Sequence, residues 1–460
     1  MVFCRENLVL YLNCIPQRIY NRRQLLKNYM NENIKKTKEQ MKMDILKLAQ
    51  DNYDYAVKIR RHLHENPELT SFEFNTLELI KNELTSMGIE WVEVPDGGIV
   101  GLIHGGKPGK MVLMRADMDA LPIQESTQNL VGEKVCVSKV PGVSHACGHD
   151  MHTAMLLAEA KILNEIKDEL NGDVVLCFER GEEGGGQVAN LLPYIVEEMK
   201  LPIESCVASH VKWDVEAGQV SAEPGAVISG GYGFRIKLHG LAGHGSRPDL
   251  GHSVLDCFHS IYAHMNMNRM KYVSPTEILT FSIGKVTCGT ALNIIPDELT
   301  FEGTTRTFNI EGAGEPFMNQ FKAVLEAECK LHHCTYEVIS MKDPLFECYN
   351  NEKCAEIAQN AIKKYIGEDA VAKAQPWMAC ESMQAYLKYW PGVITFTGIK
   401  NDAMGTGANH HTPEFEVDDK GMIAGITAAI GYVIEFQNYE GEIPFKQFPG
   451  TIRDLSSRNF

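Results

Sequence analysis

The chain has 460 residues, of which 44% are hydrophobic and 23% charged, and this balance excludes disorder over its whole length. The length suits two or three domains. There are 44 Lys and Arg against 60 Asp and Glu, a net charge of −16, so we expect no nucleic-acid partner because polyphosphates are repelled. No apolar run approaches the roughly 18–20 residues of a membrane helix, so we expect no membrane partner.

Cysteine usage and the amino terminus bear on the compartment. The 13 cysteines are scattered along the chain rather than densely spaced, which favours reduced thiols and a cytoplasmic location. Residues 1–43 carry nine Lys or Arg and three Glu, a net of +6. They form a poor signal peptide and are interpreted as a basic N-terminal extension, with an organelle address as the alternative.

In chain order, the first half alternates helices with short apolar strands. Helices are predicted over 43–63 and 73–87, strands over 99–104 and 111–114, a helix up to about residue 170, and strands over 173–178 and 204–209. This alternation predicts an α/β domain with a mostly parallel sheet and helices on both faces. Three of the strands run into clusters of acids or histidines, at the edge where such sheets bind ligands.

The pattern changes after residue 228. Alternating strands over 234–238, 278–286 and 297–308, separated by helices over 253–268 and 315–331, fit the β-α-β-β-α-β order of a ferredoxin-like α+β domain. The predicted layout is therefore a catalytic domain (44–228 and 341–445) interrupted by an inserted domain (229–340). A strand over 393–397 and a final helix over 418–436 complete the catalytic domain, and 446–460 is a C-terminal tail.

Two short motifs contain donors suited to a divalent metal. Cys147 and His149 have C-x-H spacing in a loop, and thiolate and imidazole bind borderline-soft cations. Glu182 and Glu183 precede three glycines, and adjacent carboxylates repel each other unless a positive charge holds them. Each motif alone also fits a structural loop or an acidic surface turn.

His210, at the end of a predicted strand, and His411, just before the last helix, add two donors. Each alone also fits an ordinary hydrogen-bonded loop histidine. Two metals sharing a bridging water would suit five ligands together: Cys147, His149, Glu183, His210 and His411. Glu182 would then be the general base that moves a proton from water to the leaving nitrogen.

The inserted domain contributes three further polar candidates. Asn293 and Arg306 could together hold a substrate carboxylate, since guanidinium binds carboxylate in a bidentate way. His244 lies in a glycine-flanked turn and could stabilise a developing oxyanion. Each of the three also fits an ordinary polar residue on a strand surface.

These motifs, in this order, resemble the dinuclear metallopeptidase family of aminoacylases, hippurate hydrolases, carboxypeptidase G and plant auxin-conjugate hydrolases. The similarity is closest to the hippurate-hydrolase/auxin-conjugate amidohydrolase branch, in which cysteine replaces the acidic bridging ligand. The matching stretches are R-R-H-L-H-E-N-P-E-L (60–69), L-M-R-A-D-M-D-A-L-P-I (113–123), H-A-C-G-H-D-M-H-T-A (145–154), E-E-G-G-G (182–186), G-H-G-S-R-P (243–248), L-N-I-I-P-D (292–297), G-T-T-R-T-F (303–308) and H-H-T-P-E-F (410–415).

The resemblance implies roles for named residues. It implies two divalent ions (Mn, Zn or Co) on the five ligands, Glu182 as acid/base and Asp117 as a support of the metal site. It also implies a lid that forms a homodimer and carries His244, Asn293 and Arg306, with the histidine and asparagine reaching the partner subunit's site. The chain departs from the family pattern at Glu179–Arg180, Asp249 and Ser382, which leaves substrate preference open.

The expected activity is metal-dependent hydrolysis of the amide bond of N-acyl or N-aroyl amino acids. A dipeptidase or carboxypeptidase of the same family is the alternative enzyme, and it would need a site for a free amine. A catalytically degenerate metal-binding relative would be expected to lack Glu182 or a ligand, and all are present. The acyl group, the amino acid and the physiological metal stay open.

Overall fold

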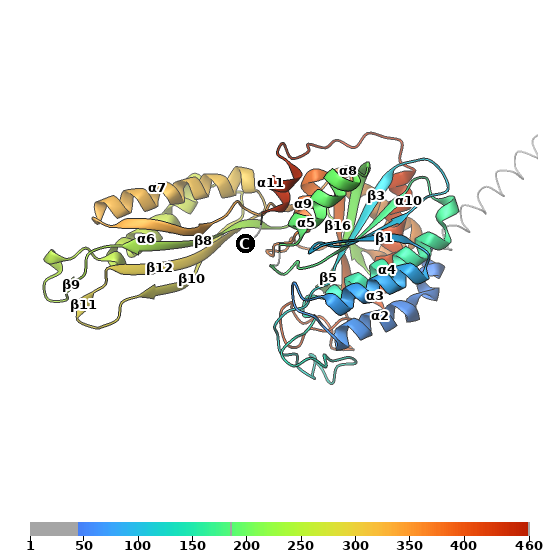
Figure 1. Ribbon diagram of the computed structural model, residues 1–460, viewed down its shortest axis with the longest axis horizontal. Helices are drawn as coiled ribbons and strands as arrows, with labels where there is room; N and C mark the ends of the chain where they lie inside the picture. Colours follow the sequence, from blue (N-terminus) through green and yellow to red (C-terminus); the bar gives the residue numbers. More distant parts are fainter. Residues whose placement is uncertain (1–44, 185, 459–460) are drawn as a thin grey trace, which may run out of the picture.

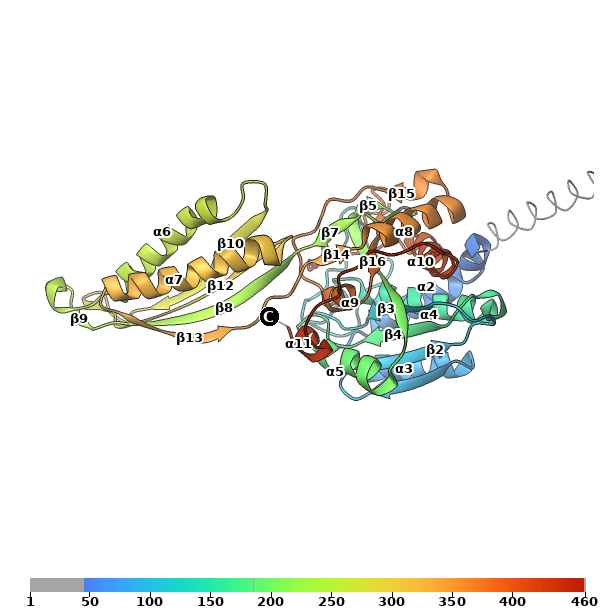
Figure 2. The same ribbon diagram turned by 90° about the horizontal axis from the view of Figure 1, so that it is seen from above.

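The computed structural model describes residues 45–184 and 186–458, and the predicted N-terminal extension (1–43) lies outside them. Two β-sheets lie side by side along the long axis of the molecule (Figures 1 and 2). The larger sheet has eight strands in the order β1-β2-β4-β3-β5-β16-β6-β15, and the smaller has four in the order β10-β12-β8-β13.

The centre of the larger sheet is parallel. β4 (Val174–Glu179), β3 (Met111–Asp117), β5 (Ile203–Glu216) and β16 (Gly392–Lys400) pair in parallel, and every residue of β3 and β4 is buried. Continuous apolar runs are typical of strands covered on both faces. The outer strands are β1 (Glu90–Val94) and β2 (Gly98–Ile103) on one edge, and β6 (Val220–Ser221) and β15 (Val371–Ala372) on the other. The predicted α/β class with a mostly parallel sheet is confirmed.

Side chains of the central strands alternate between two hydrophobic cores, one on each face of the sheet. Val112 and Met114 of β3 point into one core, while Met111 and Leu113 point into the other. The first core is closed by α2 (Tyr53–Glu65), α3 (Phe74–Ser86), α4 (His149–Glu165), α8 (Glu352–Tyr365) and α10 (Gly421–Gln437). The second is closed by α5 (Val188–Pro193), α9 (Met383–Tyr389) and α11 (Ile452–Ser456).

The smaller sheet has the β-α-β-β-α-β order expected of a ferredoxin-like domain. Its elements are β8 (Gly230–His239), α6 (Val254–Tyr272), β10 (Leu279–Cys288), β12 (Glu298–Thr307), α7 (Glu315–Leu331) and β13 (Thr335–Met341). All neighbouring strands are antiparallel, and both helices lie on one face (Figure 1). Aromatic rings fill the space between helices and sheet, with the Phe234 and Phe321 centroids 4.8 Å apart.

Short elements complete the chain. The two-stranded pairs are β7 (Gly225–Ile228) with β14 (Cys348–Asn350), and β9 (Gly243–His244) with β11 (Ile294–Ile295). Single turns of tighter or wider helix are η1 (Lys167–Glu169), η2 (Tyr194–Met199), η3 (Pro248–Leu250), η4 (Ile310–Gly314) and η5 (Glu368–Ala370).

The two linkers between the sheets are hydrogen-bonded to each other. Gly231, at the start of β8, donates to the Leu345 carbonyl (3.0 Å), and the Leu345 N–H donates back to Gly231 (3.1 Å). A Cβ at Gly231 would lie 2.0 Å from the Thr305 carbonyl oxygen, so only glycine lets the start of β8 lie this close to β12. The outgoing and returning chains therefore form one narrow connection.

The structure corrects three predicted boundaries. β5 was expected to stop before His210, but it runs on to Glu216 because Val211 and Val215 are buried and β16 continues to pair with it. The predicted helix 43–63 is interrupted at Asn52, whose side chain donates to the Leu48 carbonyl (3.0 Å) and competes with the helical pattern. The helix over 418–436 is not the last one, because α11 follows it in the tail.

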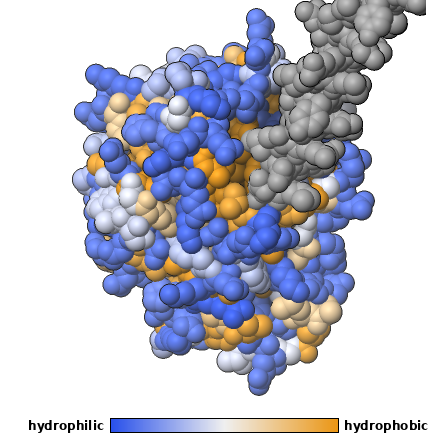
Figure 3. All heavy atoms as spheres, turned by 90° about the vertical axis from the view of Figure 1, so that its right-hand side faces the viewer, coloured by the Kyte–Doolittle hydropathy of each residue, from blue (hydrophilic) through white to orange (hydrophobic). Residues whose placement is uncertain are grey.

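No helix among the described residues is both long and apolar enough to cross a bilayer. The end of the molecule opposite the smaller sheet is covered mostly by hydrophilic side chains (Figure 3). The 11 described cysteines are all free thiols.

A buried polar network fixes the loop that precedes α10. The Lys134 ammonium donates to Glu125 (2.9 Å) and to the Pro413 and Phe415 carbonyls (both 2.8 Å). Burial would raise the pKa of Glu125, but the hydrogen bond from His64 and its charge lower it to about 2, so the carboxylate is ionised at neutral pH. The network thus ties residues 125–134 to the segment that carries His411.

Lys134→Met is expected to lower the free energy of unfolding by about 3–5 kcal/mol, because it removes the buried ammonium group that Glu125 and the Pro413 and Phe415 carbonyls share. Chemical denaturation at pH 7 measures the change. Lys139→Met is the matched control, since Lys139 pairs with Glu65 at the surface with 66% of its side chain exposed, and it should leave stability unchanged within error. Equal stability of both variants would contradict a structural role for the network.

Candidate active site

Metal-binding donors gather at the carboxyl edge of the parallel strands. Cys147 and His149 lie where α4 begins, His210 lies in β5, Glu183 follows β4, and His411 lies in the loop before α10. The structure therefore brings together all five donors that the sequence singled out, from segments more than 260 residues apart.

The five donors form two groups that share one sulfur. Cys147, His149 and His210 form one group, Cys147, Glu183 and His411 the other, and within each group the donor atoms lie within 4.8 Å of one another. Cys147 Sγ is 3.7 Å from His210 Nε2, and His411 Nε2 is 3.1 Å from Glu183 Oε1. Two three-donor groups with a common sulfur are the arrangement that a pair of neighbouring cations needs.

The hydrogen bonds around the cluster fit this use. His149 Nδ1 bonds to Asp119 (3.1 Å) and His210 Nδ1 bonds to its neighbouring Val211 carbonyl (2.7 Å), which leaves each Nε2 facing the cluster. The buried His149 Nε2 has no hydrogen-bond partner. An imidazole whose outer nitrogen is held and whose inner nitrogen is unsatisfied is typical of a metal ligand. The residues therefore fit divalent cations.

Cys147 and His411 lie in two loops that are hydrogen-bonded to each other. Burial, followed by the charge of Glu183, raises the pKa of the Cys147 thiol, so a cation is what would hold it as thiolate. His411 has a left-handed backbone (φ 60°), and its N–H donates to the Ala146 carbonyl (2.9 Å). This bond fastens the His411 loop directly to the Cys147 loop.

Two aspartates support the cluster, and sequence reasoning gave a role to only one of them. Asp117 bonds to His152 Nδ1 (2.6 Å), and His152 Nε2 accepts from the Val211 N–H (2.9 Å) beside His210. Asp119 holds His149 and also accepts from the N–H groups of Glu182 (3.2 Å) and Glu183 (3.0 Å). The i, i+2 spacing of the two aspartates at a strand end was the available signal for Asp119.

Glu182 is held at the wall of the cavity. Its Oε1 accepts from the Ser382 N–H (2.9 Å). Burial, and then the charges of Glu381 and Glu183, raise its pKa well above that of an ordinary glutamate. A carboxylate that moves protons near neutral pH needs a shift in this direction.

Arg115 is a site residue that sequence reasoning missed. Its guanidinium contacts Asp117 (2.6 Å), Glu179 (3.2 Å) and Glu381 (3.0 Å). It also donates to the Ser382 hydroxyl (2.6 Å). An arginine inside an otherwise apolar strand was the signal, because a buried cation requires nearby acids.

The charge pair Glu179–Arg180 was expected beside the site, but its two members separate. Glu179 faces Arg115 and accepts from the Tyr386 hydroxyl (2.7 Å). Arg180 turns the other way, to Glu73 (2.9 Å) and the Phe74 ring. Only the carboxylate therefore reaches the cavity.

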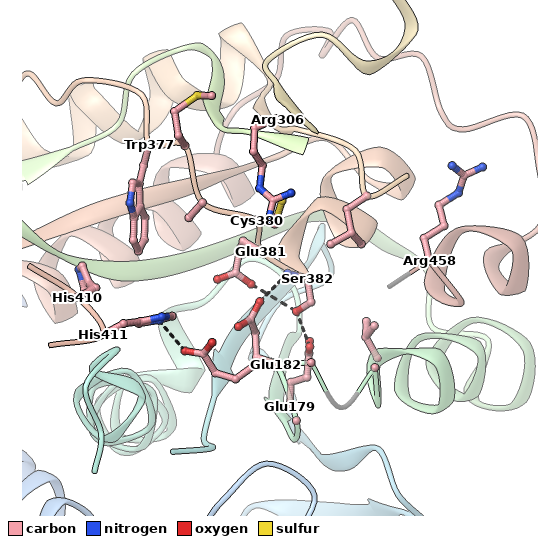
Figure 4. A pocket seen from close by; sticks show the side chains of 18 of the residues that line it. Glu179, Glu182, Arg306, Trp377, Cys380, Glu381, Ser382, His410, His411 and Arg458 are labelled. Carbon is pink, nitrogen blue, oxygen red and sulfur yellow. Dashed lines mark hydrogen bonds and ion pairs between the residues drawn. The ribbon is translucent and has the colours of Figure 1, made fainter. Parts of the chain in front are cut away.

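A cavity of about 550 Å³ opens beside the donors (Figure 4), a size typical of small-molecule sites. Glu182, Glu183 and His411 line one side, and Trp377 and His410 provide an aromatic wall with ring centroids 4.8 Å apart. Arg306 reaches the cavity from β12 of the smaller sheet.

His244 and Asn293 do not reach this cavity. They lie in and beside the β9–β11 pair, at the end of the smaller sheet farthest from the larger one (Figure 1), and both are exposed. His244 Nδ1 instead bonds to the Ser246 hydroxyl (2.8 Å). Within one chain, the structure thus separates two of the predicted site residues from the other seven.

Cys147→Ala is expected to abolish binding of both metal ions, because it removes the sulfur that both donor groups share. His210→Ala should remove about one ion per chain, since only one group contains it. Equilibrium dialysis against Mn²⁺ or Zn²⁺ with elemental analysis measures the stoichiometry. Cys288→Ser, in β10 of the smaller sheet, is the control. Full metal content in Cys147→Ala would contradict the shared-sulfur arrangement.

The sequence model of peptidase family M20/M25/M40 matches residues 113–434. Thermostable carboxypeptidase 2 of Saccharolobus solfataricus is 32% identical over 411 residues, covering 87% of this chain and 99% of the relative. IAA-amino acid hydrolase ILR1-like 4 of Arabidopsis thaliana is 32% identical over 408 residues (86% and 90%), and N-acetyl-L-cysteine deacetylase of Bacillus subtilis is 31% identical over 369 residues (80% and 84%).

Solved structures agree with the sequence relatives. The Bacillus subtilis YXEP protein, described as a dinuclear metal-binding peptidase of the M20 family, superposes with a TM-score of 0.71 at 25% identity, covering 85% of this chain and 99% of that one. The expected family and hydrolase class are confirmed. This chain belongs to the peptidase family M20/M25/M40, whose members are metal-dependent hydrolases of amide bonds.

Proposed function

We propose that this protein hydrolyses the amide bond of N-acyl or N-aroyl amino acids, using two divalent ions (Mn, Zn or Co) on Cys147, His149, Glu183, His210 and His411. The observation that carries the proposal is the position of Glu182, oriented by the Ser382 N–H between the donor cluster and a cavity that Arg306 also lines. Base, metal donors and a carboxylate-binding cation thus surround one small space.

Each residue around the cavity has a role in the proposed reaction that follows from its position. When bound, the two ions supply Lewis-acid activation of the carbonyl and of the water. Arg306 binds the substrate carboxylate through its planar guanidinium, which fixes the amide over the cluster. Glu182 takes a proton from the attacking water and delivers it to the leaving nitrogen. Trp377 and His410 present rings against which an acyl or aroyl group can pack.

The arrangement of charges favours a blocked amino group over a free amine. A dipeptide needs a carboxylate for its ammonium group, and two cavity carboxylates outside the donor cluster are Glu179 and Glu381. Both already face Arg115, and Glu381 also accepts from the Met383 N–H (3.0 Å). A free ammonium group would therefore have to pair with Glu182 or Glu183, which the proposal assigns to proton transfer and to the metal ions.

His244 and Asn293 enter the proposal through a second subunit. Because they lie at the far tip of the smaller sheet, we propose that a homodimer places them at the partner's cavity. His244 would there stabilise the oxyanion, and Asn293 would assist Arg306 with the carboxylate. We also propose a cytoplasmic location, which the 13 scattered cysteines favour.

A substrate panel separates the candidate activities. Metal-restored protein is expected to release amino acids from N-acetyl, N-benzoyl and p-aminobenzoyl amino acids, while metal-stripped protein should release none. Amino-acid release is followed by a ninhydrin assay or by chromatography. Release from dipeptides alone would replace the acyl-amino-acid function with a dipeptidase function.

Glu182→Gln is expected to lower kcat by about 10²-fold or more, because the amide cannot accept a proton, while metal content stays at the wild-type level. Steady-state kinetics measures kcat, and elemental analysis measures the metal content. Glu133→Gln, which changes an exposed acid, is the matched control. A wild-type kcat in Glu182→Gln would show that another group is the base.

Mixing two inactive variants tests the partner-subunit role of His244. If His244 acts across a dimer, a mixed dimer of His244→Ala and Glu182→Gln collects both defects in one site and leaves the other site intact. About a quarter of wild-type activity should return after subunit exchange. If the mixture remains inactive while mass measurements show mixed dimers, His244 does not act in the partner's site.

A further inference from the structure

Three cysteines lie close together at one end of the smaller domain, and we call them the thiol cluster. Cys257 is in the first turn of α6, Cys329 is in the last turn of α7, and Cys334 directly precedes β13. Thr335, the next residue, pairs with His239 at the end of the sheet farthest from the larger one (Figure 1). The thiol cluster therefore lies apart from the cavity, and the proposed function uses none of its members.

The sulfurs of Cys257 and Cys329 are in direct contact. They lie 3.9 Å apart, and the Cys257 thiol donates a weak hydrogen bond to Cys329. Sulfurs in a disulfide lie about 2.0 Å apart, so each needs to move by only about 1 Å, which a small rotation of the two side chains can supply. α6 and α7 pack on each other and hold the two side chains face to face. The pair is thus already arranged for a covalent bond.

The contact also makes the two thiols chemically different. The hydrogen bond from Cys257 lowers the pKa of the Cys329 thiol, while the same bond, and then burial, raise the pKa of Cys257. The thiolate is the form of cysteine that reacts with peroxides. Cys329 is therefore the sulfur that reacts first, and Cys257 is the thiol that lies beside it.

The thiol cluster lies just beneath the protein surface. The residues Cys329 and Cys334 are 3% and 6% exposed, whereas their chain neighbours Lys330, Leu331 and His333 are exposed. The last turn of a helix opens more readily than its centre. A molecule as small as hydrogen peroxide can therefore reach Cys329 through a local opening at the end of α7.

Cys334, the third thiol, is less suited to the reaction. Its sulfur faces two carbonyl oxygens, those of His332 (3.5 Å) and Ser253 (4.0 Å). Burial raises the pKa of this thiol to about 11, so Cys334 is protonated at neutral pH. We expect it to remain a thiol under conditions that oxidise Cys329.

We propose that Cys257 and Cys329 form a reversible disulfide that links α6 to α7 when the protein meets a peroxide. The Cys329 thiolate attacks one peroxide oxygen, the O–O bond breaks, and the sulfur becomes a sulfenic acid, while the other oxygen takes up a proton and leaves as water. The Cys257 thiol then attacks the Cys329 sulfur, the S–O bond breaks, and a second water leaves with the Cys257 proton. Two thiols are oxidised and one hydrogen peroxide is reduced to two waters.

Trypsin separates the three cysteines, so the bonded pair can be identified. The expected peptides span residues 238–269, 323–330 and 331–342, and each contains one cysteine. Reduced, full-length, Mn²⁺-loaded protein is treated with hydrogen peroxide without denaturant, and the remaining thiols are blocked with N-ethylmaleimide. Mass spectrometry of the non-reduced digest should show 238–269 joined to 323–330 with the loss of two hydrogen atoms. Dithiothreitol should restore both peptides by thiol–disulfide exchange.

Cys334→Ala is the matched control, because it removes the neighbouring thiol and should leave the yield of the joined peptides at the wild-type level. Cys329→Ala should abolish the joined pair and leave Cys257 blocked by N-ethylmaleimide. If Cys329→Ala does not fold, the peptide map of the wild type decides alone, since it needs no variant.

Three results would overturn the proposal. The first is a bond between 238–269 and 331–342, which would assign Cys334 as the partner of Cys257. The second is survival of both thiols at peroxide concentrations that already oxidise other cysteines of the chain, and the third is a bond that forms only in urea. The readout is the state of three thiols, so each result is independent of which amide bond the protein cleaves.

Discussion

The site depends on one buried cation, the guanidinium of Arg115. Asp117, Glu179 and Glu381 all lie within 3.2 Å of it, at the edge of the sheet where Glu182 and Glu183 also lie. So many carboxylates repel one another in a buried setting unless positive charge is placed among them. Arg115 provides that charge from within β3 itself, and the remaining acids are left for cations that the protein binds.

The position of Arg115 separates the carboxylates that orient neighbouring side chains from those that face the cavity. Carboxylates that contact Arg115 act on their neighbours: Asp117 orients His152, and Glu179 accepts from Tyr386. Glu182 and Glu183, which do not contact it, face the cavity and the donor cluster. The sheet fixes the positions of these carboxylates, because parallel strands packed on both faces cannot shift without disturbing two cores.

The sequence predicts the fold and the site best where polar residues with suitable chemistry follow a regular local pattern of strands and helices. Apolar strands ending in polar residues identified the edge of the sheet, and the βαββαβ order identified the smaller domain. It succeeded less well where long-range packing decides: the extension of β5 beyond His210 depends on its partner β16, which is almost 200 residues away. Arg115 and Asp119 were missed for the same reason, since most of their partners lie far along the chain. The positions of His244 and Asn293 cannot be read from motifs at all, because a motif carries no distance.

The narrow connection at Gly231 and Leu345 turns the smaller sheet into a lever. Arg306 pairs with Gly231 in the sheet register, directly at this pivot, whereas β9 and β11 lie at the opposite end. For any rotation about the pivot, displacement grows with distance from it. A given angular motion therefore leaves Arg306 almost stationary while it sweeps His244 through a wide arc. The proposed substrate contact of Arg306 and the proposed reach of His244 to a partner subunit would thereby be decoupled, although the same sheet carries both residues.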